Sequence, residues 1–291
     1  MPITRFVVPF GFDGAADRAA RAFVRAFAGD EGGIDVENVP GEGGLLGVRR
    51  ANDLAERGST PVLLLATPST HLLLPLRLGP AAAPCRAFGP FLGLGSAPNV
   101  LLASPALGVR TVEELIARSR AGDLVYASAG AGQTIHVCMA YFCHLAGIAM
   151  THRPFDGGST HAYGELAAGR VHVYFDNLLG CRNAIEGADV VPLAVSSVMR
   201  SPILPEVPTL AECGFREHAL DVWFGVFGAH VDCASLRELS KAAGADAALS
   251  ATFAAMGLTG CFADANALGD QVAASAPMWE RALSAALRQP R

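Results

Sequence analysis

Two segments of this chain share one local pattern, in which a short apolar stretch runs into a loop of small residues that opens a helix. The first covers residues 6–17 and the second covers residues 124–136. The first amides of a helix lack intrahelical partners and lie at the positive end of its dipole. A loop of glycine, alanine and serine lets a small anionic or polar ligand approach that backbone closely. The two segments therefore predict a ligand that is bound from two sides.

Strand-like and helix-like patterns alternate along the rest of the chain. Strands are expected at 3–10, 34–39, 62–66, 91–94, 99–103, 124–127, 171–175, 190–196 and 222–227. Helices are expected at 15–28, 44–57, from 111, at 134–146, from 160 to 168, at 209–214, 234–257 and 266–288. Residues 75–91 are rich in proline, glycine and alanine and are expected to cross the surface without regular structure. The alternation predicts parallel α/β sheets with ligands at the carboxyl ends of strands.

The composition excludes several classes of function. The net charge of −5 argues against a nucleic-acid surface, and Lys241 is the only lysine, which excludes a Walker A loop. The seven cysteines form no Cys-x-x-Cys pair, and the eight histidines include no His-Glu-x-x-His motif. We therefore expect neither a metal nor a cofactor.

The cellular compartment stays open at this stage. No apolar run approaches the roughly 20 residues that span a bilayer, and the N-terminus does not read as a signal peptide. We expect a periplasmic protein if a native leader was removed, and a cytoplasmic protein otherwise.

Eight short motifs occur in a characteristic order. They are Val8-Pro-Phe10 with Gly14 and Asp17, Val36–Gly44, Pro98–Val100, Tyr126–Gly130, Phe175–Asn177, Arg200–Pro202, Pro205–Thr209 and Trp223–Gly225. In the presence and order of these motifs, the chain resembles the extracytoplasmic solute receptors of tripartite tricarboxylate transporters, often called Bug proteins. The resemblance runs from near residue 3 to the end of the chain.

The resemblance implies a type II periplasmic-binding-protein fold with two α/β lobes and a ligand cleft between them. One lobe would consist of 1–102 and 221–291, and the other of 103–220. Members of this family bind small carboxylates and deliver them to membrane permease subunits. Carried over by position, the implied ligand contacts are Phe10, Gly14, Ala15, Thr67, Ser69, His71, Ser128, Gly130, Thr134, Phe155, Gly158, Ser159 and Asp176.

The first loop departs from the family at Phe12 and Asp13, where relatives have small residues and the first glycine of a pair. Two carboxylates about 4 Å apart repel by roughly 4 kcal/mol at an effective dielectric near 20. Asp13 therefore points away, is balanced by Arg153, or faces a ligand that offers a hydroxyl or amine. Phe12 narrows the pocket or stacks on a planar ligand, and both residues join the candidate ligand contacts.

Two roles remain open for Asp13, and two for Asp176. Asp13 is either a loop residue that caps the following helix or a general base in a closed cleft. Asp176 either orients loop amides or touches the ligand. The leading hypothesis is a solute receptor that makes and breaks no bond. The alternative is a cytoplasmic, cofactor-free isomerase, epimerase or lyase for a small carboxylic acid, with Asp13 as its catalytic residue.

Overall fold

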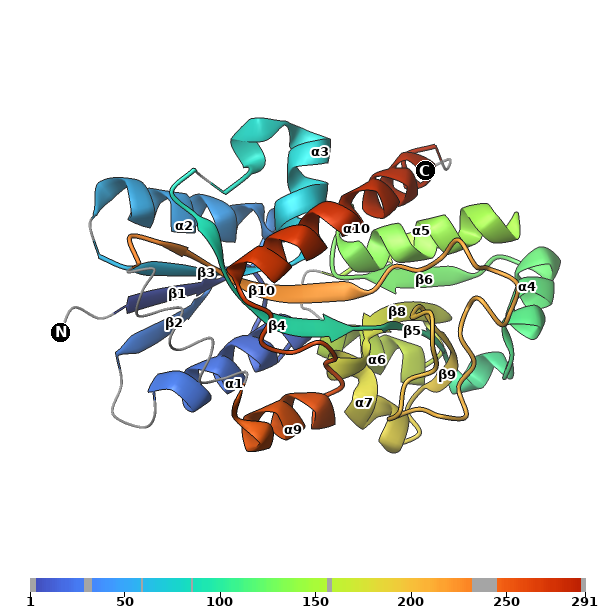
Figure 1. Ribbon diagram of the computed structural model, residues 1–291. Coiled ribbons are helices and arrows are strands. Elements are labelled where there is room, and N and C mark those ends of the chain that lie inside the picture. Colours follow the sequence, from blue (N-terminus) through green and yellow to red (C-terminus); the bar gives the residue numbers. More distant parts are fainter. Residues whose placement is uncertain are drawn as a thin grey trace. The chain divides into compact units, whose positions relative to one another are not determined.

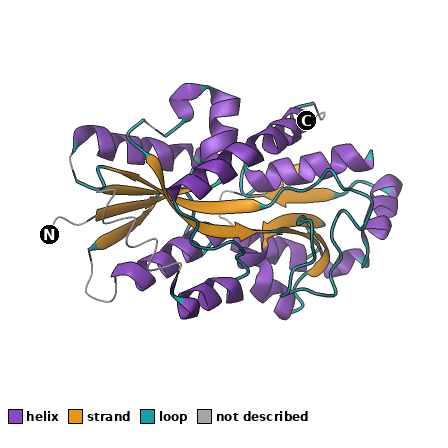
Figure 2. Ribbon diagram, in the orientation of Figure 1, coloured by secondary structure: helices purple, strands orange, loops and turns teal. Residues whose placement is uncertain are grey.

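The computed structural model describes residues 4–28, 33–58, 60–84, 86–155, 159–231 and 245–288. Contacts between residues divide the chain into two compact units. Unit 1 consists of Met1–Ser96 with Trp223–Pro277, and unit 2 consists of Ala97–Val222 with Met278–Arg291. Each unit contains one five-stranded sheet with helices packed on it, as Figures 1 and 2 show. A two-lobed α/β fold is confirmed.

The sheet of unit 1 has the strand order β2-β1-β3-β10-β4. Its strands are β1 (Thr4–Val8), β2 (Ile34–Asn38), β3 (Val62–Ala66), β4 (Gly89–Ala97) and β10 (Val222–Ala229). The helices α1 (Ala15–Ala28) and α2 (Leu45–Arg57) lie on opposite faces of this sheet (Figure 1). Further along the chain follow α3 (Leu74–Leu78), α9 (Ala247–Ala255) and α10 (Ala265–Ala286), of which α10 spans both units.

The sheet of unit 2 has the strand order β7-β6-β8-β5-β9. Its strands are β5 (Asn99–Ala103), β6 (Val125–Ser128), β7 (Thr151–Pro154), β8 (Val173–Asn177) and β9 (Val191–Val195). Figure 1 shows α5 (Thr134–Ala146) on one face and α6 (Ser159–Ala167) with α7 (Leu178–Glu186) on the other. The helix α4 (Val112–Ala121) begins with the expected capping box, in which Thr111 accepts from the amide of Glu114.

Neither sheet is purely parallel, which corrects the prediction from strand–helix alternation. In unit 1, β10 pairs antiparallel with β3, and in unit 2, β5 pairs antiparallel with both β8 and β9. Such strands enter a sheet without a crossover helix, so alternation along the chain does not reveal them. The pairing of β5 also places residues 99–102 in unit 2, whereas the predicted lobe boundary fell after residue 102.

Three predicted segments differ from the structure. The stretch 75–91 contains most of α3 and the beginning of β4 rather than irregular chain only. Residues 209–214 form turns instead of a short helix, although Thr209 and Glu212 exchange the hydrogen bonds of a capping box. The helix expected over 234–257 falls partly outside the described residues, and α9 has its own N-cap, Asp246.

The close approach of α2 to the end of β1 depends on Gly47. A Cβ added at Gly47 would lie 2.5 Å from Pro9 Cα and 3.0 Å from the carbonyl oxygen of Val39. Both neighbours are backbone atoms, which cannot rotate away as a flexible side chain does. This glycine therefore fixes how closely the helix packs beside the loop that follows β1.

We predict that Gly47→Ala destabilises the protein by about 2 kcal/mol, because the methyl group overpacks this contact. The matched control is Gly164→Ala in α6, where an added Cβ meets no atom within 4 Å. That change should stabilise the protein by up to about 1 kcal/mol, because alanine favours a helix. Urea unfolding followed by circular dichroism measures both values, and equal effects would contradict the packing argument.

Candidate functional site

In unit 1, three loops meet at the carboxyl edge of the sheet. They follow β1, β2 and β3. A Cβ added at Gly44 would lie 3.2 Å from Thr70 Cγ2 and 3.6 Å from Pro9 Cβ, so residues of all three loops lie close together. The predicted residues Phe10 to Ala15 and Thr67 to His71 therefore lie at one edge of one sheet. Carboxyl edges of such sheets are where α/β proteins bind ligands.

The loop after β1 is held by the buried carboxylate of Asp17, which is 1% exposed. Arg21 Nε donates to both oxygens of Asp17 at 2.9 Å, and the amide of Asp13 donates to Oδ2 at 2.9 Å. Asn38 Nδ2 donates to Asp17 Oδ1 at 2.9 Å and to the carbonyl of Phe10 at 3.1 Å. Burial raises the pKa of Asp17, but these hydrogen bonds outweigh it and hold the pKa below its usual value. The network fixes the path of the loop.

Asp13 takes a left-handed backbone conformation, with φ at 60°. Aspartate tolerates this region better than most residues, and glycine occupies it without strain. This conformation accounts for an aspartate at a position where the resembling proteins have glycine. Its carboxylate is 56% exposed and accepts from Arg18 Nε at 3.1 Å, so Arg18 pairs with it; Arg153 was one of the three alternatives left open by the sequence.

The Phe12 side chain is 74% exposed. It is the one aromatic residue among the large apolar side chains that the structure describes as exposed. Its ring lies against the guanidinium group of Arg21, with Arg21 Cζ 5.0 Å from the ring centroid. Because Arg21 is tied to Asp17, the ring is held on an ordered loop. One ring face is covered by a cation, and much of the remaining ring is open to solvent.

The loop after β3 is buried. Thr67 and Ser69 are 4% and 2% exposed, and the hydroxyl oxygen of Thr67 has no hydrogen-bond partner. His71 packs against Phe227, with ring centroids 4.2 Å apart, and burial lowers the pKa of His71 to about 3. Because the Thr70 hydroxyl donates to the Thr67 carbonyl, His71 Nδ1 donates to Thr70 Oγ1. Nε2 is then an acceptor, buried and without a partner.

In unit 2, the corresponding loop joins β6 to α5. Ser128 is fully buried, and its hydroxyl accepts from the amide of Gly130 at 3.2 Å. Gly130 and Gly132 have φ values of 134° and 76°, which L side chains rarely adopt. Gln133, at the N-cap of α5, makes no side-chain capping hydrogen bond, and Thr134 opens the helix at 6% exposure. No acidic residue lies in the first turn of α5.

Sequence reasoning missed the role of two histidines in this loop. His152 Nε2 lies 2.6 Å from Ser128 Oγ, and His136 Nδ1 accepts from the amide of Gly132 at 3.1 Å. The two imidazole rings are 4.2 Å apart, and His152 stacks on Tyr126 at 4.9 Å. Burial lowers the pKa of His152 to about 4. His152 is 24 residues from Ser128, so only the sheet register of β6 and β7 reveals its contact with this loop.

The Asp176 carboxylate is engaged at the start of α7. Its oxygens accept from the hydroxyl of Tyr163 and, at 2.8 Å, from the amide of Asn177. A Cβ at Gly180 would lie 2.8 Å from Asp176 Oδ2, so the carboxylate rests on the first turn of that helix. This geometry orients the backbone at the end of β8.

Asn99 and Asn177 were not among the predicted site residues. They are paired directly across β5 and β8, so their side chains lie on the same face. Asn99 Nδ2 donates to the carbonyl of Leu220 at 2.6 Å, whereas the Oδ1 atoms of both asparagines are buried without a partner. Two neighbouring acceptors are thereby available at this end of the sheet.

The remaining predicted residues follow β7. The amide of Phe155 donates to the carbonyl of Ser128 at 2.8 Å, which ties this segment to the β6 loop. Arg153 lies 3.6 Å from Glu165 and 5.2 Å from the centre of the Phe155 ring. Gly158 lies outside the described residues, and Ser159 is the first residue of α6.

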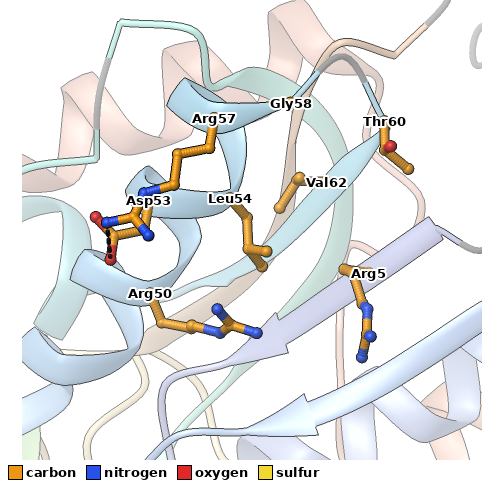
Figure 3. A pocket seen from close by; sticks show the side chains of 8 residues that line it. All are labelled: Arg5, Arg50, Asp53, Leu54, Arg57, Gly58, Thr60 and Val62. Carbon is orange, nitrogen blue, oxygen red and sulfur yellow. Dashed lines mark ion pairs between the residues drawn. The ribbon is translucent and has the colours of Figure 1, made fainter.

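A surface pocket of about 480 Å³ lies where β1 and β3 begin and α2 ends, at the other end of the strands (Figure 3). Three arginines line it, but Arg5 pairs with Asp35, Arg50 with Glu37 and Arg57 with Asp53. None of the predicted site residues lines this pocket.

Comparison with known sequences assigns the chain to a protein family. The chain is 34% identical over 232 residues to a Pseudomonas sp. (strain P51) protein from the tcbD-tcbE intergenic region, covering 78% of this chain and 67% of that protein. It is 31% identical to the protein BugT of Bordetella pertussis, over 76% of this chain and 69% of BugT. A family profile described as "Tripartite tricarboxylate transporter family receptor" matches residues 32–260. The chain belongs to this receptor family.

Solved structures agree with this assignment, and the resemblance drawn from the sequence motifs is confirmed. The receptor superposes on R. palustris Rpa4515, solved with adipate, with a TM-score of 0.85 and 26% identity over 98% of this chain and 96% of the other. Its fold also matches the periplasmic binding protein BugD, with a TM-score of 0.84 and 23% identity over 99% and 98% of the two chains. Like its relatives by family, this receptor is a solute-binding protein. Among its described helices, none combines the length and apolar character needed to cross a bilayer.

The buried network at Asp17 yields a stability prediction for the receptor. Asp17→Asn should cost about 3 kcal/mol, because it leaves Arg21 without its buried carboxylate partner. Asp53→Asn is the control, since Asp53 and Arg57 form an exposed pair 3.8 Å apart. That change should cost under about 0.5 kcal/mol in chemical unfolding. Similar losses in the two variants would contradict a central role for Asp17.

The buried histidines of the receptor predict a loss of stability in mild acid. Burial lowers the pKa of His71 to about 3 and of His152 and His218 to about 4, against an ordinary value of 6.5. Below pH 6.5 the unfolded chain therefore binds more protons than the folded chain, and the free energy of unfolding falls with pH. Asp17 does not mask this effect, because its lowered pKa changes the free energy of unfolding only in more acidic solution, near and below the ordinary aspartate pKa of 3.8.

Urea unfolding at several values between about pH 7.5 and about pH 5.5 measures this dependence. His152→Gln should reduce the slope, since a glutamine amide can still hydrogen-bond to Ser128 Oγ but does not titrate. His144→Gln, at an exposed position of α5, should leave the slope unchanged. A free energy of unfolding that is constant or rises toward low pH would overturn the assignment of neutral, buried histidines.

Proposed function

We propose that the receptor binds a small organic carboxylate through the loop between β6 and α5. The observation that supports this most directly is the absence of any side-chain cap or first-turn acid at the start of α5. The start of a helix is the positive end of its dipole and favours a negatively charged group. Ser128, Gly130 and Thr134 supply the hydroxyl groups and the open backbone around it.

The two helix starts differ in charge, which supports this placement of the carboxylate. The start of α1 already holds two carboxylates, those of Asp13 and Asp17, each paired with an arginine. The start of α5 holds none. A ligand carboxylate therefore meets less repulsion at α5, where the helix dipole favours an anion by about 0.3–1 kcal/mol.

The other predicted contacts are proposed as secondary ones. In unit 1 these are Phe10, Phe12, Asp13, Gly14, Ala15, Thr67, Ser69 and His71, and in unit 2 they are Phe155, Gly158, Ser159 and Asp176. The unpartnered hydroxyl of Thr67 is suited to a polar ligand group. His71 is the least suited of the set, because its ring is packed against Phe227.

The ligand class is supported by the chemistry of related receptors. R. palustris Rpa4515 was solved with adipate, and MatC from Rhodopseudomonas palustris was solved with bound malate. Both molecules are small carboxylates, which matches an uncapped helix start. We propose the same class for this receptor, without assigning one molecule.

Membership of the family also supports proposals about the partners of the receptor and its cellular compartment. A receptor of a tripartite transporter passes its ligand to membrane components, and we propose such permease subunits as partners. BugD is described as a periplasmic binding protein, and we propose the same compartment for this receptor.

The catalytic alternative has no comparable support. A general base in a dry site needs a buried, unpaired carboxylate. Asp13 is 56% exposed and is paired with Arg18. Within the part of the chain that the structure describes, no contact specifically favours an isomerase, epimerase or lyase over a receptor.

Isothermal titration with a panel of carboxylates tests the proposal. At least one acid should bind the receptor, and Ser128→Ala should weaken that acid about tenfold, by loss of one hydrogen bond to a charged group. Ser119→Ala on α4 is the control, because its hydroxyl bonds only to the Ala149 carbonyl in the described structure. A panel without any binder, or equal effects of the two variants, would refute the proposal.

A further inference from the structure

The pocket drawn in Figure 3 lies apart from the predicted ligand contacts of unit 1. It is bordered by the end of α2 and the beginnings of β1 and β3, and all residues that line it belong to unit 1. Its volume of about 480 Å³ is large enough for a small ligand, since ligand pockets commonly enclose about 300–1,000 Å³. The proposed carboxylate contact, in unit 2, does not account for this pocket.

Most of the charged side chains that line the pocket are arginines. Of its described lining residues, Arg5 on β1 and Arg50 and Arg57 on α2 are basic, and Asp53 is acidic. The three arginine side chains are 44%, 41% and 81% exposed, so a ligand from solvent can reach all of them. The lining therefore offers an anion more positive than negative groups.

The ion pairs of Arg5 and Arg50 leave several of their N–H groups without a partner. A guanidinium group carries five N–H donors in a rigid fork. Arg50 donates to Glu37 through Nε at 2.9 Å and Nη2 at 3.2 Å, and its Nη1 donates to no described residue. Arg5 donates to Asp35 through Nη1, and its Nε and Nη2 donate to no described residue. Each arginine can therefore bind a second anion while it keeps its carboxylate partner.

Arg57 and Thr60 supply further donors beside the end of α2. Arg57 Nη2 lies 3.8 Å from Asp53 Oδ2, which is beyond hydrogen-bonding distance, and the Thr60 hydroxyl bonds to no described residue. The carboxyl end of α2 is the negative end of its dipole and repels an anion. Arg57 lies in the last turn of α2, so its charge offsets that repulsion.

The base of the pocket is apolar and well supported. Val62 is 2% exposed and belongs to the hydrophobic core of unit 1, and Leu54 packs against that core. Arg5 is paired with Val62 in the register of β1 and β3, so its backbone is fixed to the same core. An apolar base keeps water from one side of a bound group, which strengthens the hydrogen bonds that this group accepts.

From these observations we infer that the pocket lined by Arg5, Arg50 and Arg57 is a second ligand site of the receptor and that it binds a phosphate group. Phosphate carries about two negative charges near neutral pH, and its oxygens point in several directions. That geometry suits donors that come from β1, from α2 and from the segment between α2 and β3. A carboxylate presents only two oxygens in one plane and meets fewer of these donors. The inference does not depend on the proposed function, which concerns a carboxylate bound by unit 2.

Isothermal titration with inorganic phosphate at low ionic strength tests the inference. The wild-type receptor should bind phosphate, and Arg57→Gln should weaken this binding about tenfold, by loss of one hydrogen bond to a charged group. The exposed pair of Arg57 and Asp53 contributes little to stability, so this variant should keep the fold. Arg57→Lys should lose less affinity than Arg57→Gln, because lysine keeps the charge but lacks the planar fork.

Arg25→Gln is the matched control. Arg25 is an exposed arginine of α1 in the same unit, and it does not line the pocket. The control removes the same charge as Arg57→Gln, so any effect of net charge on anion binding is the same in both variants. It should leave phosphate affinity within about twofold of the wild-type value. Thermal melting of each variant verifies that the fold is intact.

Cosedimentation with vesicles distinguishes a soluble phosphate from a phosphate on a lipid. Vesicles of phosphatidylcholine with phosphatidic acid carry a phosphate monoester at their surface, and vesicles of phosphatidylcholine alone are the blank. Binding of inorganic phosphate alone assigns the pocket to a soluble ligand, whereas vesicle binding that Arg57→Gln reduces assigns it to a lipid head group. Either result supports the inference.

Two outcomes would overturn the inference. The first is that neither inorganic phosphate nor the phosphatidic acid vesicles bind the wild-type receptor. The second is that Arg57→Gln and Arg25→Gln change the affinity equally, because phosphate is then bound elsewhere. Neither outcome bears on the carboxylate titrations that test the proposed function.

Discussion

The buried carboxylate of Asp17 is the interaction on which the first loop depends. It gathers donors from α1, from β2 and from the loop itself, through Arg21, Asn38 and the amide of Asp13. A charge this deeply buried is stable only when it is paired and hydrogen-bonded. The same group fixes the arginine that supports Phe12. One carboxylate therefore sets both the path of the backbone and the position of an exposed ring.

The second loop is built by different chemistry for a similar task. Ser128 and Gly132 bond to the rings of His152 and His136, and both contacts involve groups without formal charge when the histidines are neutral. Because these side chains are neutral, no side-chain charge opposes the positive end of the α5 dipole. At the first loop, the ion pairs already place carboxylates at the positive end of the α1 dipole. Two segments of similar sequence pattern therefore differ in the charge that they hold at the start of a helix.

The local pattern of apolar and small residues in the sequence was enough to predict much of the fold. The bounds of α1, β3 and α5 follow from apolar periodicity and small-residue loops, and they match at 15–28, 62–66 and 134–146. The antiparallel partners β5 and β10 could not be predicted, because strand direction depends on long-range pairing rather than on period. For the candidate site, Ser128 and Gly130 came from the family resemblance of their loop and stay predictions, whereas the contacts of His152 and Asn99 join positions distant in sequence and could not be predicted.

The left-handed backbone at Asp13 has a consequence for how such receptors diversify. Only glycine, asparagine and aspartate occupy that conformation readily, so the chain keeps its course through any exchange among them. Each exchange nevertheless changes the charge or hydrogen-bonding capacity at the surface of the loop. A lineage could thus alter the electrostatic character of its recognition edge in single steps, without rebuilding the scaffold beneath.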